Sequence, residues 1–271
     1  MLNSFNLFVD DMERPTQLQF LRELNNLLQF GFHKNMLNFQ GICQTSDWFF
    51  VVFEEAPITL KKFLLNARRE VNLNNPRLTN LSEEHILKLI YDLAETMEYL
   101  SFNKIVHKNL NSYNVKVVRQ NGIYGLKLSI FGPTLYYNVD EENKNKQIDD
   151  ERWFSPEMIK FQKFSHASDV WSFALVSWEC CCLGGTVYGS IPTSDLLTRI
   201  KKGLRPEQHP FIYDDLYQMF INCWEIDAFE RPSFNDIVIQ LKQLQSSPNY
   251  ALNYNVDAKL PYFMPLLELK N

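Results

Sequence analysis

The sequence predicts an α+β fold in two lobes, a small N-terminal lobe with strands and a larger, mainly helical C-terminal lobe. The strand-like runs precede Pro57, whereas most of the chain after it carries helical signals. The length of 271 residues, with 45% hydrophobic residues, is sufficient for a sizeable buried core. We place the lobes at residues 1–56 and 57–245, followed by a C-terminal tail at 246–271.

The N-terminal lobe begins with a predicted helix over residues 16–30, where leucines recur at helical spacing before Gly31. Two strands are predicted next, at 36–43 and 48–54. The second reads WFFVVFE and is rich in aromatic and β-branched residues, which favour strands.

The C-terminal lobe is predicted to contain helices at 60–69, 82–102 and 170–182, with an Asn-rich loop at 70–81. Ser82 is a favourable N-cap, because its hydroxyl can accept a hydrogen bond from the first turn. The run from Val170 is apolar on nearly every side, so we expect that helix at the centre of the lobe.

Charge and cysteine content narrow the function classes. Lys and Arg number 27 against 32 Asp and Glu, giving a net charge of −5, without the basic excess of a nucleic-acid-binding protein. The five cysteines follow neither disulfide nor zinc spacing, and three of them, at 180–182, are expected to be buried. No secretory signal or membrane-spanning run is apparent, so we expect a soluble cytoplasmic domain.

Five motifs carry the functional signal, and they occur in a fixed order. They read IVHKNLNSYNVKVV at 105–118, LKLSIFG at 126–132, RWFSPE at 152–157, SDVWSFALVSWE at 168–179 and CWEIDAFERPSF at 223–234. In this order and spacing the chain resembles a protein kinase of the tyrosine kinase branch over residues 16–245. The resemblance implies a bilobal protein-kinase-like fold with an incomplete N-terminal lobe.

The resemblance assigns structural roles to several polar residues. Glu157 and Arg231 resemble the family's glutamate–arginine pair, and Asp169 the aspartate that hydrogen-bonds the catalytic-loop backbone. His107 resembles the histidine of that loop. Glu23 resembles the glutamate of the helix that borders the nucleotide site in this family.

The residues that perform phosphoryl transfer in this family are mostly replaced. Asn109 stands where the family has the aspartate that accepts the substrate proton, and a neutral amide cannot take that proton. Ile130 stands in place of the metal-binding aspartate. Asn114 keeps the second metal-ligand position as a vestige, and Lys108 replaces a frequent arginine.

The nucleotide-binding parts also depart from the family pattern. The first glycine is Gly31, and no lysine precedes Lys34, so Glu23 lacks its usual ion-pair partner. Phe53 resembles the residue that guards the pocket behind the adenine site, next to a hinge that begins at Glu54. We interpret the missing strands as a truncation or an incomplete gene model. No cofactor is expected, with ATP bound without Mg²⁺ as the alternative.

We therefore interpret the chain as a pseudokinase that acts as a binding or allosteric module, within a larger receptor-like protein. Its expected partner is an active kinase or receptor, with membrane contact only through a parent segment. Tyr136 and Tyr137 are candidate phosphorylation sites. The alternatives are a weak or unconventional ATP-dependent tyrosine kinase and a scaffold without any ligand.

Overall fold

The computed structural model describes residues 3–7, 33–44, 49–74, 81–120, 122–129 and 150–246. The predicted helix at 16–30 lies outside these ranges, as does the tail after 246. So do four residues of predicted functional importance, Glu23, Ile130, Tyr136 and Tyr137. The proposed domain boundaries stay predictions.

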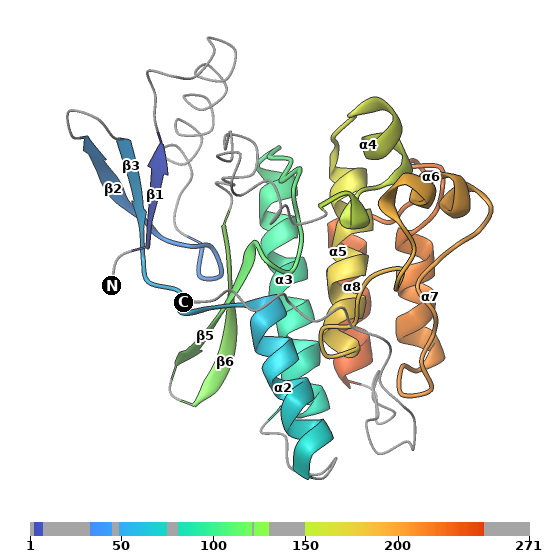
Figure 1. The fold of residues 1–271 in the computed structure, drawn as a ribbon, viewed down its shortest axis with the longest axis horizontal. Coiled ribbons are helices and arrows are strands. Elements are labelled where there is room, and N and C mark those ends of the chain that lie inside the picture. The colour runs from blue at the N-terminus through green and yellow to red at the C-terminus, as the bar shows by residue number, and fades with distance from the viewer. Residues whose placement is uncertain are drawn as a thin grey trace.

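The elements follow the order strands, helices, a hairpin and then helices (Figure 1). The strands are β1 (Asn3–Leu7), β2 (Phe39–Gln44), β3 (Phe49–Phe53), β4 (Ile58–Thr59), β5 (Val115–Gln120) and β6 (Ile123–Leu128). The helices are α2 (Leu60–Asn74), α3 (Glu83–Phe102), the 3-10 turn η3 (Asp150–Trp153), α4 (Pro156–Phe161), α5 (His166–Cys181), α6 (Thr193–Lys201), α7 (Asp214–Cys223) and α8 (Phe234–Ser246).

The small lobe is built on an antiparallel sheet of order β1-β3-β2, which stands apart from the helices in Figure 1. The first predicted strand begins later than expected, at Phe39 rather than residue 36. The reason is that Met36 forms a parallel bridge with Leu128 of β6 instead. The prediction of the second strand is confirmed as β3.

A second sheet of order β4-β5-β6 lies against the helical lobe. The segment at 35–37, just before β2, is hydrogen-bonded to β6 of this sheet. The N–H of Leu37 donates to the carbonyl of Leu128 at 2.8 Å, and the N–H of Leu128 donates to the carbonyl of Asn35 at 2.8 Å. The 35–37 segment is therefore fixed to the hairpin of β5 and β6 by main-chain bonds.

Helix α5 forms the centre of the helical lobe, as predicted. Every residue from Ser168 to Cys181 is buried, and α3 packs against both α5 and α8. The cap predicted at Ser82 is also confirmed, because its Oγ accepts from the N–H of His85 and the His85 ring accepts from the N–H of Ser82.

Two helix boundaries differ from the prediction. Helix α2 continues to Asn74 although the sequence favoured a loop from residue 70. Pro76 restricts mainly the backbone conformation of the residue before it, so the proline does not end the helix before Asn74. Arg68 also anchors α2, because its guanidinium donates to the carbonyl of Cys182 at 3.1 Å. Helix α5 begins at His166 because Ser165 and Ser168 form a reciprocal capping box.

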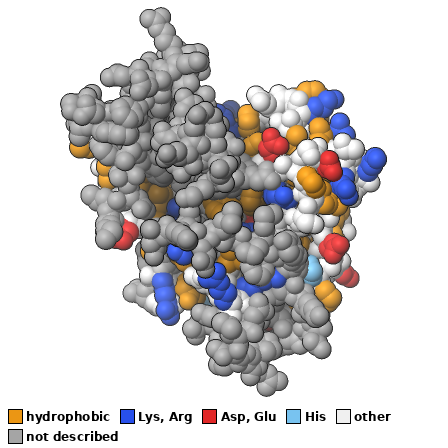
Figure 2. Space-filling view, viewed as in Figure 1, with side chains coloured by type: hydrophobic (Ala, Val, Ile, Leu, Met, Phe, Trp, Pro, Cys, Tyr) orange, Lys and Arg blue, Asp and Glu red, His pale blue; other side chains and the backbone are white. Residues whose placement is uncertain are grey.

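The cysteines at 180–182 are buried, as the sequence predicts. Cys180, Cys181, Cys182 and Cys223 are buried and Cys43 is exposed, all of them as free thiols. On the face seen in Figure 2, acidic and basic side chains are intermixed over the described part of the molecule. Within the described ranges, no helix combines the length and the apolar character needed to cross a membrane.

Candidate functional site

The catalytic-loop segment follows α3, and its backbone is hydrogen-bonded to Asp169 in the first turn of α5. Asp169 is buried, and its two carboxylate oxygens accept hydrogen bonds from the N–H of His107 at 2.7 Å and of Lys108 at 3.0 Å. Burial raises the pKa of Asp169 to about 7, against the lowering effect of these two donors and of the Lys108 charge.

Lys108 itself has a φ of 71°, in the left-handed region that disfavours side chains. Such a conformation costs about 1–3 kcal/mol and persists only where the surroundings impose it. The bond from its N–H to Asp169 supplies that constraint. The loop backbone is therefore fixed in a bent form by one buried carboxylate.

The histidine of the loop is fixed by bonds on both ring nitrogens. Nδ1 of His107 accepts from the N–H of Asn109 at 3.3 Å, so Nε2 carries the proton and donates to the carbonyl of Ser129 at 2.9 Å. Burial lowers the pKa of His107 to about 4, so the ring is neutral at pH 7. This bond ties the loop to the residue that precedes Ile130.

Asn109, which the family resemblance places at the position of the proton-accepting aspartate, is buried and its amide is already hydrogen-bonded. Its side-chain oxygen accepts from Nδ2 of Asn111 at 2.9 Å. Its carbonyl accepts from Nδ2 of Asn114 at 2.8 Å. The oxygen of Asn111 in turn accepts from the N–H groups of Tyr113 and Asn114, both at 3.0 Å. Three amides thus form a connected network where the family resemblance implies a catalytic carboxylate.

Sequence reasoning did not single out Asn111. The available signal was the spacing of two asparagines, Asn109 and Asn111, because short amide side chains commonly bond groups two residues away and stabilise turns. That spacing predicts a local turn, and only the tertiary structure shows that the amides bond each other.

The residues of this segment do not fit a magnesium nucleotide. Mg²⁺ prefers carboxylate oxygens, and the family resemblance places Asn114 and Ile130 at the two ligand positions. Asn114 uses its NH₂ group on the loop carbonyl, which leaves one neutral oxygen for a metal. Across the described ranges there is no group of three His, Cys, Asp or Glu side chains placed to hold a metal ion.

At the hinge, Phe53 ends β3 with its side chain fully buried, and its ring meets that of Phe39 edge-on at 5.9 Å. Strand β1 pairs with β3 and has the sequence NSFNL, and its end at Asn6 and Leu7 falls where the family resemblance implies the phosphate-binding lysine. That strand therefore contains no lysine.

The next residue, Glu54, forms a polar cluster that sequence reasoning missed. Its Oε1 accepts from the N–H of Asn38 at 3.0 Å and lies 2.8 Å from Nζ of Lys127 on β6. The N–H of Glu54 donates to the carbonyl of Asn38 at 2.8 Å. The hinge is thereby connected to both β6 and the turn before β2.

The glutamate–arginine pair joins α4, which contains Glu157, to the segment before α8. Arg231 donates through both terminal nitrogens to Glu157, at 2.6 and 2.9 Å, and its guanidinium lies 5.1 Å from the ring of Trp171. Burial alone would raise the pKa of Glu157, but the hydrogen bonds and charge of Arg231 outweigh it and the pKa is lowered. The structure brings these two residues together, 74 positions apart in the chain.

A second buried ion pair was not anticipated. Nζ of Lys61 on α2 lies 2.7 Å from Oε1 of Glu179 on α5, which also accepts from Ser112 of the catalytic loop at 3.2 Å. The other oxygen of Glu179 accepts from Nε1 of Trp153 at 2.7 Å. The signal in the sequence was a single glutamate inside an apolar helix, since a buried charge requires a partner.

Comparison with known proteins agrees with the motifs. Residues 7–241 match the family model described as protein tyrosine and serine/threonine kinase. A protein of Drosophila melanogaster named "Putative inactive tyrosine-protein kinase Wsck" is 41% identical over 269 residues, which is 97% of this chain. The chain spans 33% of that relative's length.

Proposed function

This chain belongs to the protein tyrosine and serine/threonine kinase family, and we propose that it is a pseudokinase domain that acts by binding other proteins. The substitutions fall on groups that would contact ATP, metal or substrate. The pairs that hold the fold together, such as Glu157 with Arg231, are intact. This division is what a fold retained for binding, without selection for catalysis, would produce.

The observation that carries this proposal is the amide network at the catalytic loop. Asn109 cannot accept a proton at neutral pH, and its oxygen is already hydrogen-bonded to Asn111. General-base assistance contributes about 10²–10⁴ in rate, so its loss alone is severe. Ile130 adds the loss of a magnesium ligand. The name of the fly relative supports the same conclusion.

The partner and the setting are further parts of this proposal. We expect an active tyrosine kinase or a receptor as the partner, on the cytoplasmic side of the plasma membrane. Two receptor-kinase-like stretches, TMEYL at 96–100 and GGTVYG at 184–189, support this setting by resemblance. We also propose that no cofactor is needed, and that any ATP binding is independent of Mg²⁺.

The first experiment is a thermal-shift titration of the purified chain with ATP, with and without Mg²⁺. A ligand that binds only the folded state raises the melting temperature. We expect no shift, or an equal shift in both conditions. A parallel assay follows transfer of labelled phosphate from ATP to a tyrosine-containing polymer, with an active tyrosine kinase as the positive control.

A shift that requires Mg²⁺, together with phosphate transfer above the level of a denatured sample, would refute the proposal. That result would favour the weak kinase instead, with Asn114 as the remaining metal ligand. An equal shift in both conditions would assign ATP a structural role.

A further inference from the structure

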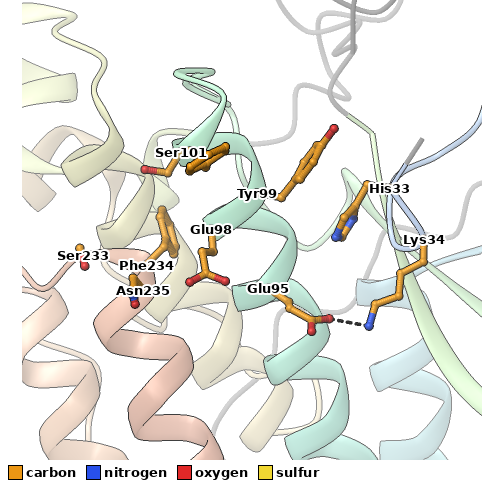
Figure 3. Close-up of a pocket in the computed structure, with 10 residues that line it drawn as sticks. His33, Lys34, Glu95, Glu98, Tyr99, Ser101, Ser233, Phe234 and Asn235 are labelled. Atoms are coloured by element: carbon orange, nitrogen blue, oxygen red, sulfur yellow. Dashed lines mark ion pairs between the residues drawn. The ribbon is translucent and has the colours of Figure 1, made fainter. Parts of the chain in front are cut away.

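A groove lies along the C-terminal half of α3, between the 33–34 turn and the start of α8 (Figure 3). It has a volume of about 790 Å³, within the range of ligand sites. One wall is the 33–34 turn, the middle is the C-terminal half of α3, and the other wall is the start of α8. An occupant would therefore contact the 33–34 turn of the small lobe as well as two helices of the large lobe.

Four aromatic or imidazole rings are among the side chains that line this groove. His33 stacks on Tyr99 with ring centroids 4.7 Å apart. Phe102, at the end of α3, is 83% exposed, which is unusual for so large an apolar side chain. Phe234 of α8 is buried, with its ring edge-on to Phe173. An exposed ring such as that of Phe102 attracts cations as well as apolar groups.

The charged groups of the groove leave one carboxylate in excess. Lys34 lies 2.7 Å from Glu95, so these two charges compensate each other (Figure 3). Glu98, one turn further along α3, points toward the start of α8. Among the residues that the structure describes, it has no hydrogen-bond or ion-pair partner.

His33 does not supply the missing positive charge. Its Nδ1 accepts from the N–H of Asn35 at 3.3 Å, which requires an unprotonated nitrogen. Burial lowers the pKa of His33, against the opposing effect of Glu95, so the ring is neutral at pH 7. The groove thus combines ring faces with an uncompensated negative charge.

We propose that this groove docks an arginine-bearing segment of a partner protein, with the guanidinium on Glu98 and against the exposed ring of Phe102. A guanidinium fits because it is planar, stacks on rings and can bond both oxygens of one carboxylate. The inference rests on the proposed function, since it names the surface through which the domain would bind.

The test uses the full chain and an array of 11-residue peptides with random flanks and a fixed central Arg, Lys, Gln or Glu. At 150 mM salt, we expect the Arg set to bind about tenfold more tightly than the Gln set. Arginine can form a charge-assisted hydrogen bond with the carboxylate and a cation–π contact with the ring, whereas glutamine can form neither. Glu98→Gln and Phe102→Ala should each abolish most of this preference. Glu98 has no hydrogen-bond or ion-pair partner among the described residues and Phe102 is 83% exposed, so these variants should keep the melting temperature of the parent chain.

The matched control is Glu84→Gln, which removes an exposed glutamate from the first turn of the same helix. It should keep the preference for Arg. Equal binding of the four peptide sets, absence of binding, or equal losses in the Glu98 and Glu84 variants would each overturn the proposal. None of these results would affect the nucleotide and phosphotransfer tests, so a failure of the groove remains distinct from a failure of the pseudokinase assignment.

Discussion

At the scale of single residues, the catalytic loop is held in its kinase-like shape by groups that do not take part in catalysis. Asp169 fixes two backbone N–H groups, and His107 bonds on both ring nitrogens. These contacts do not depend on a carboxylate at position 109. The loop can therefore keep its shape after the loss of the catalytic group, which explains how fold and activity can separate.

The lowered pKa of the partly buried His107 imidazole predicts a pH dependence of stability. Its folded pKa is lowered to about 4 from the usual 6.5. Below pH 6.5 this imidazole is protonated in the unfolded chain but stays neutral in the folded chain. The free energy of unfolding therefore falls as the pH drops from about 6.5 to about 4. Replacement by glutamine, His107→Gln, should remove this contribution.

The measurement is the urea midpoint of both chains at four pH values between 4.5 and 7.5. The difference between the parent chain and His107→Gln should change across this range. Asp169 has a raised pKa and acts in the opposite direction, but it is present in both chains and its effect largely cancels in the difference. Parallel curves would contradict the prediction.

Restoring the carboxylate at position 109 alone should not restore activity. Asn109→Asp keeps the size of the side chain, and the new carboxylate can still accept from Asn111. Magnesium would still lack the carboxylate that Ile130 replaces, so we expect no phosphate transfer beyond that of Asn109→Ala. The labelled-phosphate assay measures this, and activity that appears in the aspartate variant only would show that the metal site is not limiting.

At the scale of elements, the buried pair of Lys61 and Glu179 connects α2 to the central helix. Both side chains are at most 6% exposed. Breaking such a pair by removing one partner typically costs about 3–5 kcal/mol, because the remaining charge stays buried. The pair therefore fixes how the first helix of the large lobe sits against α5.

A double-mutant cycle tests this connection. Lys61→Met should lower the free energy of unfolding by about 3–5 kcal/mol. In the double variant Lys61→Met/Glu179→Gln the loss should be smaller than the sum of the two single losses. Urea denaturation of the four chains gives the coupling energy. An exposed pair on the surface of α6, Asp195 and Arg199, serves as the control, and its cycle should give less than about 1 kcal/mol.

At the scale of the whole molecule, the proposed function predicts dependence on another enzyme for phosphorylation. The purified chain with ATP and Mg²⁺ should remain unphosphorylated, because the groups that perform transfer are replaced. Addition of an active tyrosine kinase should place phosphate on Tyr136 or Tyr137. Intact-mass spectrometry before and after that addition measures this, with a Tyr136→Phe/Tyr137→Phe variant as the control. Phosphate gained by the chain alone would contradict the proposal.

Much of the architecture could be predicted because it rests on local signals. The apolar run from Val170 and the cap at Ser82 each specify a helix through residues close in the chain, and both are confirmed. The limits of β2 and α2 could not be predicted in the same way. They depend on the bridge from Met36 to Leu128 and on the anchor from Arg68 to Cys182, which join distant residues.

For the function, the sequence by itself determined the family, because motif order needs no coordinates, and the residues at positions 109 and 130 predict the loss of catalytic groups. Only the tertiary structure decided which polar groups are satisfied and by which partners. Such cases are the bonds of Asn109 with Asn111, the pair of Lys61 with Glu179, and the carboxylate of Glu98, which has no partner among the described residues. Hydrogen bonds and ion pairs act over a few ångströms in space, and a linear pattern does not encode which distant side chains come within that range.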